Sequence, residues 1–190
     1  MVKVGFIVEG HCEKAVLGSN AFQAYLSEIG ILTVHEVQNA RGKTNLINHV
    51  ATSQARIARD EGAEHIVVLR DLDSLPDVET AELEVIQAND LSVCVAVQEL
   101  ESWFLADSAT MSAVFKTNFF FEHPEREPKP SETLDTLSQQ YRQGRGITDK
   151  RQFTNLMLAN GFTIQQAAQH PNCPSANYFL TKLKTLASAK

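Results

Sequence analysis

The alternation of short apolar runs with segments of helical periodicity constrains this chain more than any other feature of its sequence. Runs rich in β-branched residues occupy 3–8, 31–37, 65–69 and 91–97, and their lengths are typical of buried strands. Segments with helical spacing separate them, and strands joined through helices form right-handed crossovers with both sheet faces covered. We therefore expect an α/β fold with a mostly parallel, four-stranded sheet flanked by helices.

The helices between these strands are bounded by turn residues. Apolar residues at helical spacing run over 15–29 and 46–58, and Gly30 and Gly62 follow them, as expected of helix ends. A third helix is predicted over 77–88.

The pattern changes after the fourth strand. Residues 99–115 have helical spacing, and 119–130 contains three aromatic residues and three prolines, which favour an exposed, extended loop. Further helices are predicted over 131–142, 149–159 and 175–188. We expect an α/β core over 1–98 and a helical C-terminal extension over 99–190 that packs on the core.

Composition narrows the class of protein. A chain of 190 residues with 43% hydrophobic content can bury a core without disulfides. Its three cysteines are far apart and form no CxxC pair, so we expect free thiols. No apolar run approaches the roughly 20 residues of a membrane span, and we expect a cytoplasmic protein. The net charge of −6 argues against coating nucleic acid by bulk electrostatics, although the acidic excess lies in 1–98.

Three carboxylates follow predicted strands. Glu9 comes directly after the first strand, and Asp71 and Asp73 follow the third. Because the carboxyl ends of parallel strands meet at one sheet edge, these side chains are expected to share a site. Clustered carboxylates repel one another, and Mg²⁺ or Mn²⁺ relieves that repulsion. Such an ion can activate water and stabilise charge in phosphoryl transfer. The alternative is that Glu9 caps a helix and the aspartates form a turn.

These motifs resemble those of the topoisomerase-primase (Toprim) family. Ile-Val-Glu9-Gly10 after the first strand and Asp71-Leu-Asp73 after the third are similar to its Glu and DxD motifs. The resemblance is closer to the Toprim-like group called domain of unknown function 4276. That likeness also includes the following segments: Val-Glu9-Gly-His-Cys-Glu13, Leu-Arg70-Asp71-Leu-Asp73, Glu99-Leu-Glu101-Ser-Trp103-Phe104-Leu-Ala-Asp107, Lys150 and Cys173-Pro174-Ser175. It spans nearly the whole chain.

The resemblance implies roles for individual residues. Glu9 would be a metal ligand or general acid/base, Asp71 and Asp73 metal ligands, and Lys150 a basic residue of the catalytic site. Glu13 is a possible auxiliary ligand. Glu101 is favoured over Glu99 as an additional ligand because the two lie about 200° apart on a helix.

Basic residues are candidates for phosphate contacts, against the alternative of ordinary solvated charge. The candidates for binding nucleic acid are Arg41, Lys43, Arg70, Arg145 and Arg151. Gly42-Lys43-Thr44 lacks the earlier glycine of a P-loop, so we expect no ATP site there. Trp103 is expected in the core. Residues 119–121 either pack in the core or stack on bases, and His11 is either an ordinary polar turn residue or a proton donor or ligand.

The leading hypothesis is an enzyme that cleaves phosphodiester bonds of DNA or RNA with Mg²⁺. The resemblance further implies a bacterial defence or mobile-element system with an ATPase partner. The second hypothesis is a module that binds nucleic acid or a partner without catalysis. A third is a phosphatase, because Asp71-x-Asp73-Ser74 resembles the nucleophile motif of haloacid-dehalogenase-type enzymes, although that motif normally follows the first strand.

Overall fold

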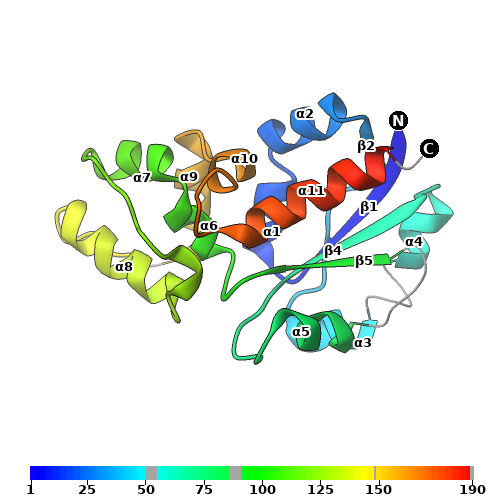
Figure 1. Cartoon of the computed structure of the whole chain (residues 1–190), viewed down its shortest axis with the longest axis horizontal. Helices are drawn as coiled ribbons and strands as arrows, with labels where there is room; N and C mark the ends of the chain where they lie inside the picture. The colour runs from blue at the N-terminus through cyan, green and yellow to red at the C-terminus, as the bar shows by residue number, and fades with distance from the viewer. Residues whose placement is uncertain (50–54, 86–90, 148, 189–190) are drawn as a thin grey trace.

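A parallel sheet is the centre of the fold. The computed structural model describes residues 1–49, 55–85, 91–147 and 149–188, and within them the sheet has five strands (Figure 1). In order of sequence they are β1 (Val2–Val8), β2 (Ile31–Thr33), β3 (Gln38–Asn39), β4 (His65–Asp71) and β5 (Leu91–Ala96). The order across the sheet is β2-β1-β4-β5, β3 also pairs with β1, and every pairing is parallel. The expected α/β class with a parallel sheet is confirmed.

One expected strand is divided in two. The run 31–37 was expected as a single strand, but β2 pairs with the start of β1 and β3 with its end. Between them, the carboxylate of Glu36 forms an ion pair with the ammonium group of Lys14 at 2.5 Å, and His35 Nε2 lies 3.4 Å from Glu61 Oε1. The sheet therefore has five strands where four were expected, because residues 34–37 lie between two separate pairings with β1.

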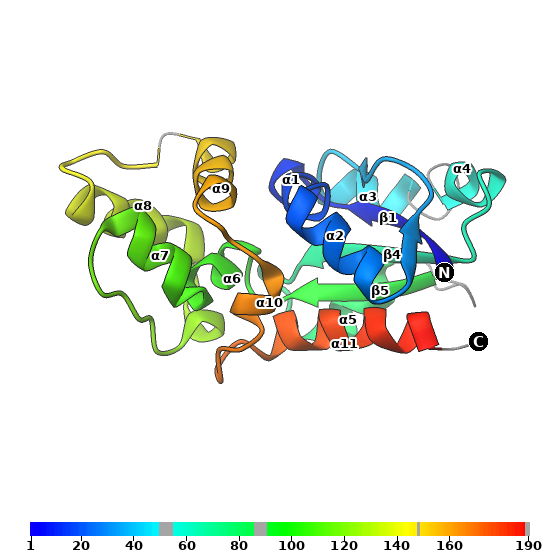
Figure 2. The ribbon, with the colours of Figure 1, turned by 90° about the horizontal axis from the view of Figure 1, so that it is seen from above.

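Helices cover both faces of the sheet (Figures 1 and 2). One face packs against α1 (His11–Leu17), α2 (Asn20–Glu28) and α11 (Pro174–Ser188). The other packs against α3 (Lys43–His49), α4 (Ala55–Asp60) and α5 (Val78–Glu84). Because both faces are buried, β1 is apolar at every position except Lys3, and β4 contains the continuous apolar run 66–69, as expected for parallel strands. None of the helices in the described ranges is long and apolar enough to cross a membrane.

Some expected helices differ in extent. The helix expected over 15–29 is interrupted at Gly18 and Ser19, where the Ser19 hydroxyl accepts from the N–H of Phe22 and starts α2. A hydroxyl at this position satisfies an N–H that the helix leaves free. The ranges 46–58 and 77–88, over which helices were expected, lie in part outside the described residues.

The second half of the chain is helical. Its elements are α6 (Glu101–Ala106), α7 (Ser108–Phe115), a 3-10 helix (Pro124–Arg126), α8 (Pro130–Tyr141), α9 (Lys150–Ala159), α10 (Ile164–Ala167) and α11. The helix expected over 99–115 breaks at Asp107, whose carboxylate accepts from the N–H of Thr110 at 3.0 Å and starts α7. Figure 2 shows α7, α8 and α9 beyond the end of the sheet to which the strand arrows point.

The segment 119–130 is not the exposed loop that its composition indicated. Phe119, Pro124 and Pro130 are buried, and only Phe120 of the three consecutive phenylalanines is strongly exposed, at 63%. Phe119 packs edge-on against Phe115, with ring centroids 5.5 Å apart. The aromatic run therefore contributes to packing. Its burial depends on tertiary contacts, which local composition does not predict.

Aromatic packing joins the helical half to the sheet half. The ring of Phe179 in α11 lies 5.9 Å from Phe22 in α2 and 5.7 Å from Trp103 in α6. Trp103 is fully buried, which confirms its expected place in the core, and its indole N–H donates to the hydroxyl of Ser175 at 2.7 Å. The two halves thus share one hydrophobic cluster.

We predict that Ser175→Ala lowers the free energy of unfolding by about 1–3 kcal/mol, because the buried indole N–H of Trp103 loses its acceptor. Urea denaturation followed by circular dichroism measures this change. Thr185→Ala, an exposed hydroxyl on the same helix, is the control and is expected to change stability by no more than about 0.5 kcal/mol. Equal stability of the two variants would contradict the prediction.

Candidate functional site

The carboxyl ends of the two central strands bring acidic residues together. Glu9 follows β1, its N–H donates to the carbonyl of Leu69 in β4, and Asp71 is the last residue of β4. Leu100 donates its N–H to Asp71 Oδ1 at 2.9 Å, which fixes this carboxylate at the sheet edge. The adjacency of Glu9 and Asp71 follows directly from the parallel pairing of β1 and β4.

Asp73 lies at the rim of this arrangement. Its backbone has a positive φ of 52°, and its N–H donates to the carbonyl of Gln98. Its carboxylate is partly exposed and lies 3.9 Å from the ammonium group of Lys43. Asp73 therefore does not line the cleft next to Asp71, although its charge is felt at Glu9.

A cleft of about 490 Å³ opens at this edge. Helices α1, α6 and α9 supply Glu13, Glu101 and Lys150 to its wall. Its other lining residues are Glu9, Gly10, His11, Cys12, Arg41, Gly42, Asp71, Asp149 and Arg151. Gly10 packs closely against Glu13, because a Cβ atom there would lie 2.9 Å from Glu13 Oε2 and would make that side chain shift.

Four of the five carboxylates that line the cleft are held in an unfavourable electrostatic environment. Burial and the charges of Glu13, Glu101, Glu9 and Asp73 raise the pKa of Asp71 well above its ordinary value. Burial, with the charges of Glu101 and Glu9, raises the pKa of Glu13 to about 7. Burial also raises the pKa of Glu9 and of Glu101. Bringing these groups together destabilises their charged forms unless a cation compensates.

Two carboxylate oxygens have no hydrogen-bond partner. Glu9 Oε2 and Glu13 Oε2 are buried without a donor in the part of the chain that the structure describes. Oxygen donors of this kind fit a hard divalent cation such as Mg²⁺ or Mn²⁺. Among the described residues, no group of three or more His, Cys, Asp and Glu side chains is placed to hold a metal ion as it stands. Binding would therefore require the carboxylates to move closer together.

Lys150 is the basic residue that contacts this acidic wall. Its ammonium group donates to Glu99 at 3.2 Å and lies 3.3 Å from Glu101. Although burial favours the neutral amine, the charges of Glu101 and Glu99 raise the pKa of Lys150 above its ordinary value. Glu101 lines the cleft, whereas Glu99 faces α8 and accepts the N–H of Ser131 at 3.0 Å.

The predicted phosphate-contacting residues separate into three groups. Arg41 and Arg151 are exposed and line the cleft, and Lys43 lies next to Asp73. Arg145 lines another cavity, between α8 and α9.

Arg70 corrects one expectation. It was a candidate for contacting nucleic acid, but it is fully buried. Its guanidinium donates to the carbonyl of Ala81 and to Glu84, each at 2.9 Å. Strand alternation points Arg70 to the face opposite Asp71, so Arg70 ties α5 to the sheet and does not reach a ligand.

Asp149 was not singled out from the sequence. Its carboxylate accepts the N–H of Arg151 at the start of α9, and it lines both the carboxylate cleft and the cavity of Arg145. An aspartate directly before a predicted helix is a recognisable capping signal. Cys12 also lines the cleft, but burial raises the pKa of its thiol to about 11, so it stays protonated near neutral pH.

No model of a known protein family matches this chain, and neither a curated protein nor a solved structure matches it. The site is therefore interpreted from its own geometry and chemistry.

The raised pKa of Glu13 predicts a pH dependence of stability. The folded protein holds this proton up to about pH 7, against an ordinary pKa of 4.5. The contribution of Glu13 to stability is therefore complete below pH 4.5 and is lost as the pH rises to about 7. Without metal, we expect Glu13→Gln to reduce this loss by on the order of 2 kcal/mol.

Urea denaturation at a series of pH values across this range, in the presence of a chelator, measures the effect. Glu79→Gln removes an exposed carboxylate of α5 and serves as the matched control. The same slope of stability against pH in Glu13→Gln and wild type would contradict the assigned environment of Glu13.

Proposed function

We propose that this protein is a Toprim-like enzyme that cleaves phosphodiester bonds in nucleic acid with the help of Mg²⁺ or Mn²⁺. The observation that carries the proposal is the pair of buried, unpartnered oxygens of Glu9 and Glu13 in an open cleft lined by five carboxylates. Such an arrangement is unfavourable by itself and becomes favourable when a hard cation binds. Phosphoryl transfer is the chemistry for which proteins most often gather carboxylates around such an ion.

The carboxylates of the cleft would hold the metal. Glu9 and Asp71 come from the central strands, and Glu13 and Glu101 come from the flanking helices, while Asp73 at the rim adds negative charge. When bound, the ion supplies polarisation of a phosphoryl oxygen and a water of lowered pKa. Glu9 would act as a ligand of this ion or as the general base that accepts a proton from water.

Basic residues beside the carboxylates fit a phosphate backbone. Lys150 is fixed by Glu99 and Glu101, and Arg41 and Arg151 line the same cleft. A phosphodiester that enters the cleft would meet these cations on its free oxygens. The surrounding acidity would repel it in the absence of metal. The proposal thus explains why cations and carboxylates share one wall.

Metal binding is the first expected outcome. At about 100 times its dissociation constant, Mn²⁺ is expected to raise the free energy of unfolding by about 2.7 kcal/mol. Glu9→Gln and Asp71→Asn are expected to weaken Mn²⁺ binding by roughly tenfold or more, and isothermal titration calorimetry measures the affinity. Without metal, both variants should be at least as stable as wild type, because each relieves repulsion.

Glu79→Gln, on the opposite face of the sheet from α1, is the control and should bind Mn²⁺ as wild type does. Wild-type affinity in both Glu9→Gln and Asp71→Asn would exclude these carboxylates as the metal site.

Cleavage is the second expected outcome. Labelled single-stranded and double-stranded DNA and RNA are incubated with Mg²⁺ or Mn²⁺, and the products are separated by gel electrophoresis. Glu9→Gln and Asp71→Asn are expected to reduce the rate by roughly 100-fold or more, and Glu79→Gln should leave it unchanged. If wild type binds the metal but cuts none of these substrates, the cleavage proposal fails and a binding module without catalysis is favoured.

A further inference from the structure

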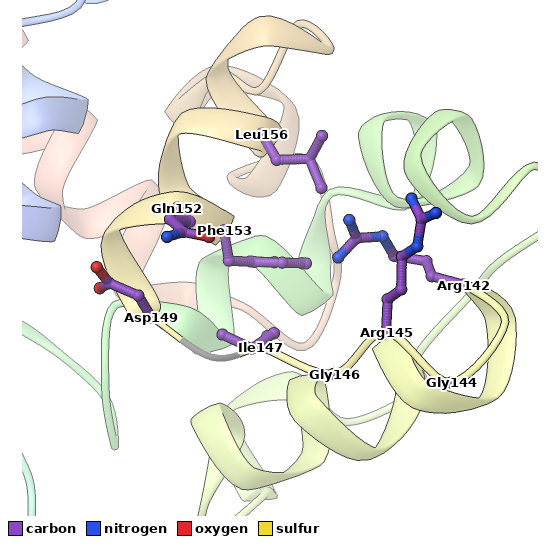
Figure 3. A pocket seen from close by; sticks show the side chains of 9 residues that line it. All are labelled: Arg142, Gly144, Arg145, Gly146, Ile147, Asp149, Gln152, Phe153 and Leu156. Atoms are coloured by element: carbon purple, nitrogen blue, oxygen red, sulfur yellow. The ribbon is translucent and has the colours of Figure 1, made fainter.

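A second cavity lies next to the carboxylate cleft. It has a volume of about 470 Å³ and lies between the end of α8 and the first turns of α9. Figure 3 shows the side chains of Ile147, Phe153 and Leu156 on one side of it and those of Arg142 and Arg145 on the other. Its volume is within the range of roughly 300–1,000 Å³ typical of small-ligand pockets.

The positive charge of this cavity is uncompensated. Neither Arg142 nor Arg145 forms an ion pair with any carboxylate among the described residues. Arg142 and Arg145 both line this cavity, while the carboxylate of Asp149 points away from them in Figure 3. Lys116 borders a smaller cavity that the same two arginines line. Like charges held close together favour a bound anion.

Hydrogen bonds fix the backbone at both arginines. The backbone N–H of Arg142 donates to the carbonyl of Ser138 at 2.9 Å, and the backbone N–H of Arg145 donates to the carbonyl of Arg142 at 3.1 Å. The carboxylate of Asp135 accepts the N–H of Ile147 and the side-chain amide of Gln139. Asp135 is thus used to anchor the segment and is not paired with either arginine. Both guanidinium groups therefore remain available to a ligand.

The two sides of the cavity define the ligand class. Guanidinium groups bind phosphate through paired hydrogen bonds, and the opposite side offers apolar contacts to a ring or sugar. A bare phosphate ion leaves the apolar side unused, and an apolar ligand leaves the arginines unpaired. A nucleotide unit matches both sides.

We infer that this cavity binds one nucleotide of the nucleic-acid strand, with its phosphate on Arg142 and Arg145 and its base or sugar against Ile147, Phe153 and Leu156. The inference rests on the proposed function for the identity of the strand. Asp149 lines both this cavity and the carboxylate cleft, so the two are neighbours and one strand would occupy both. The cavity would therefore fix which phosphodiester lies at the carboxylates.

The test measures binding without metal, so that the carboxylate site takes no part. Fluorescence anisotropy of a labelled single-stranded oligonucleotide is recorded in a chelator over a range of salt concentrations. Arg142→Gln/Arg145→Gln is expected to lower affinity by roughly tenfold or more. It should also make the slope of log affinity against log salt less steep by about 0.7, because the two arginines share one phosphate and each phosphate contact on a single strand contributes about 0.7.

Arg56→Gln changes an exposed arginine on α4 and is the matched control, with wild-type affinity and slope expected. Circular dichroism confirms that each variant is folded. Equal affinity and slope in the double variant and this control would overturn the inference, as would the absence of any oligonucleotide binding by wild type.

Competition with adenosine monophosphate distinguishes the two sources of a nucleotide unit. If adenosine monophosphate displaces the labelled oligonucleotide only at a far higher concentration than unlabelled oligonucleotide does, the cavity binds a nucleotide of a strand. If both competitors act at the same concentration, the inference of a strand is overturned and the cavity is assigned to free nucleotides. The proposed function fails separately: arginine-dependent binding by a wild type that cuts nothing would contradict cleavage and support this cavity.

Discussion

The contact of Lys150 with Glu99 and Glu101 is the interaction on which the arrangement of the site depends. It joins the first turn of α9 to the segment that follows β5, and so connects the helical half of the chain to the sheet edge at which the carboxylates gather. Glu99 extends the connection to α8 through the N–H of Ser131. The position of every helix beyond the sheet is thus coupled to the acidic wall of the cleft.

This coupling makes the site composite. The two central strands end at Glu9 and Asp71, whereas two of the three cations that line the cleft, Lys150 and Arg151, come from α9 in the second half of the chain. Both halves therefore contribute charged groups to one cleft. The aromatic contacts of Phe179 with Phe22 and Trp103 supply the rigid packing that keeps the halves in register.

The fold was predictable where hydrophobic periodicity was strong. The parallel sheet followed from the alternation of strands and helices, because each buried strand is apolar on both faces. Breaks within elements were less predictable, since they depend on single side chains. Ser19 and Asp107 each start a new helix by accepting a backbone N–H, and the short α10 has too few residues to show a period.

Topology alone predicted the adjacency of Glu9 and Asp71, because parallel strands end at the same edge. Topology did not predict where the side chains of the neighbouring residues Arg70 and Asp73 lie. Arg70 is buried because strand alternation turns it toward α5, where its guanidinium donates to the carbonyl of Ala81 and pairs with Glu84. Asp73 has a positive φ. An aspartate tolerates this conformation, but the local sequence does not predict it.

The division of the outer strand into β2 and β3 has a consequence for how this molecule behaves in a crowded solution. An unbroken outer strand is a template onto which another chain can add by backbone hydrogen bonding. Here that template consists of two short pieces, and the ion-paired side chains of His35 and Glu36 lie between them. The charged gap between these pieces therefore protects this edge of the sheet from edge-to-edge association and aggregation.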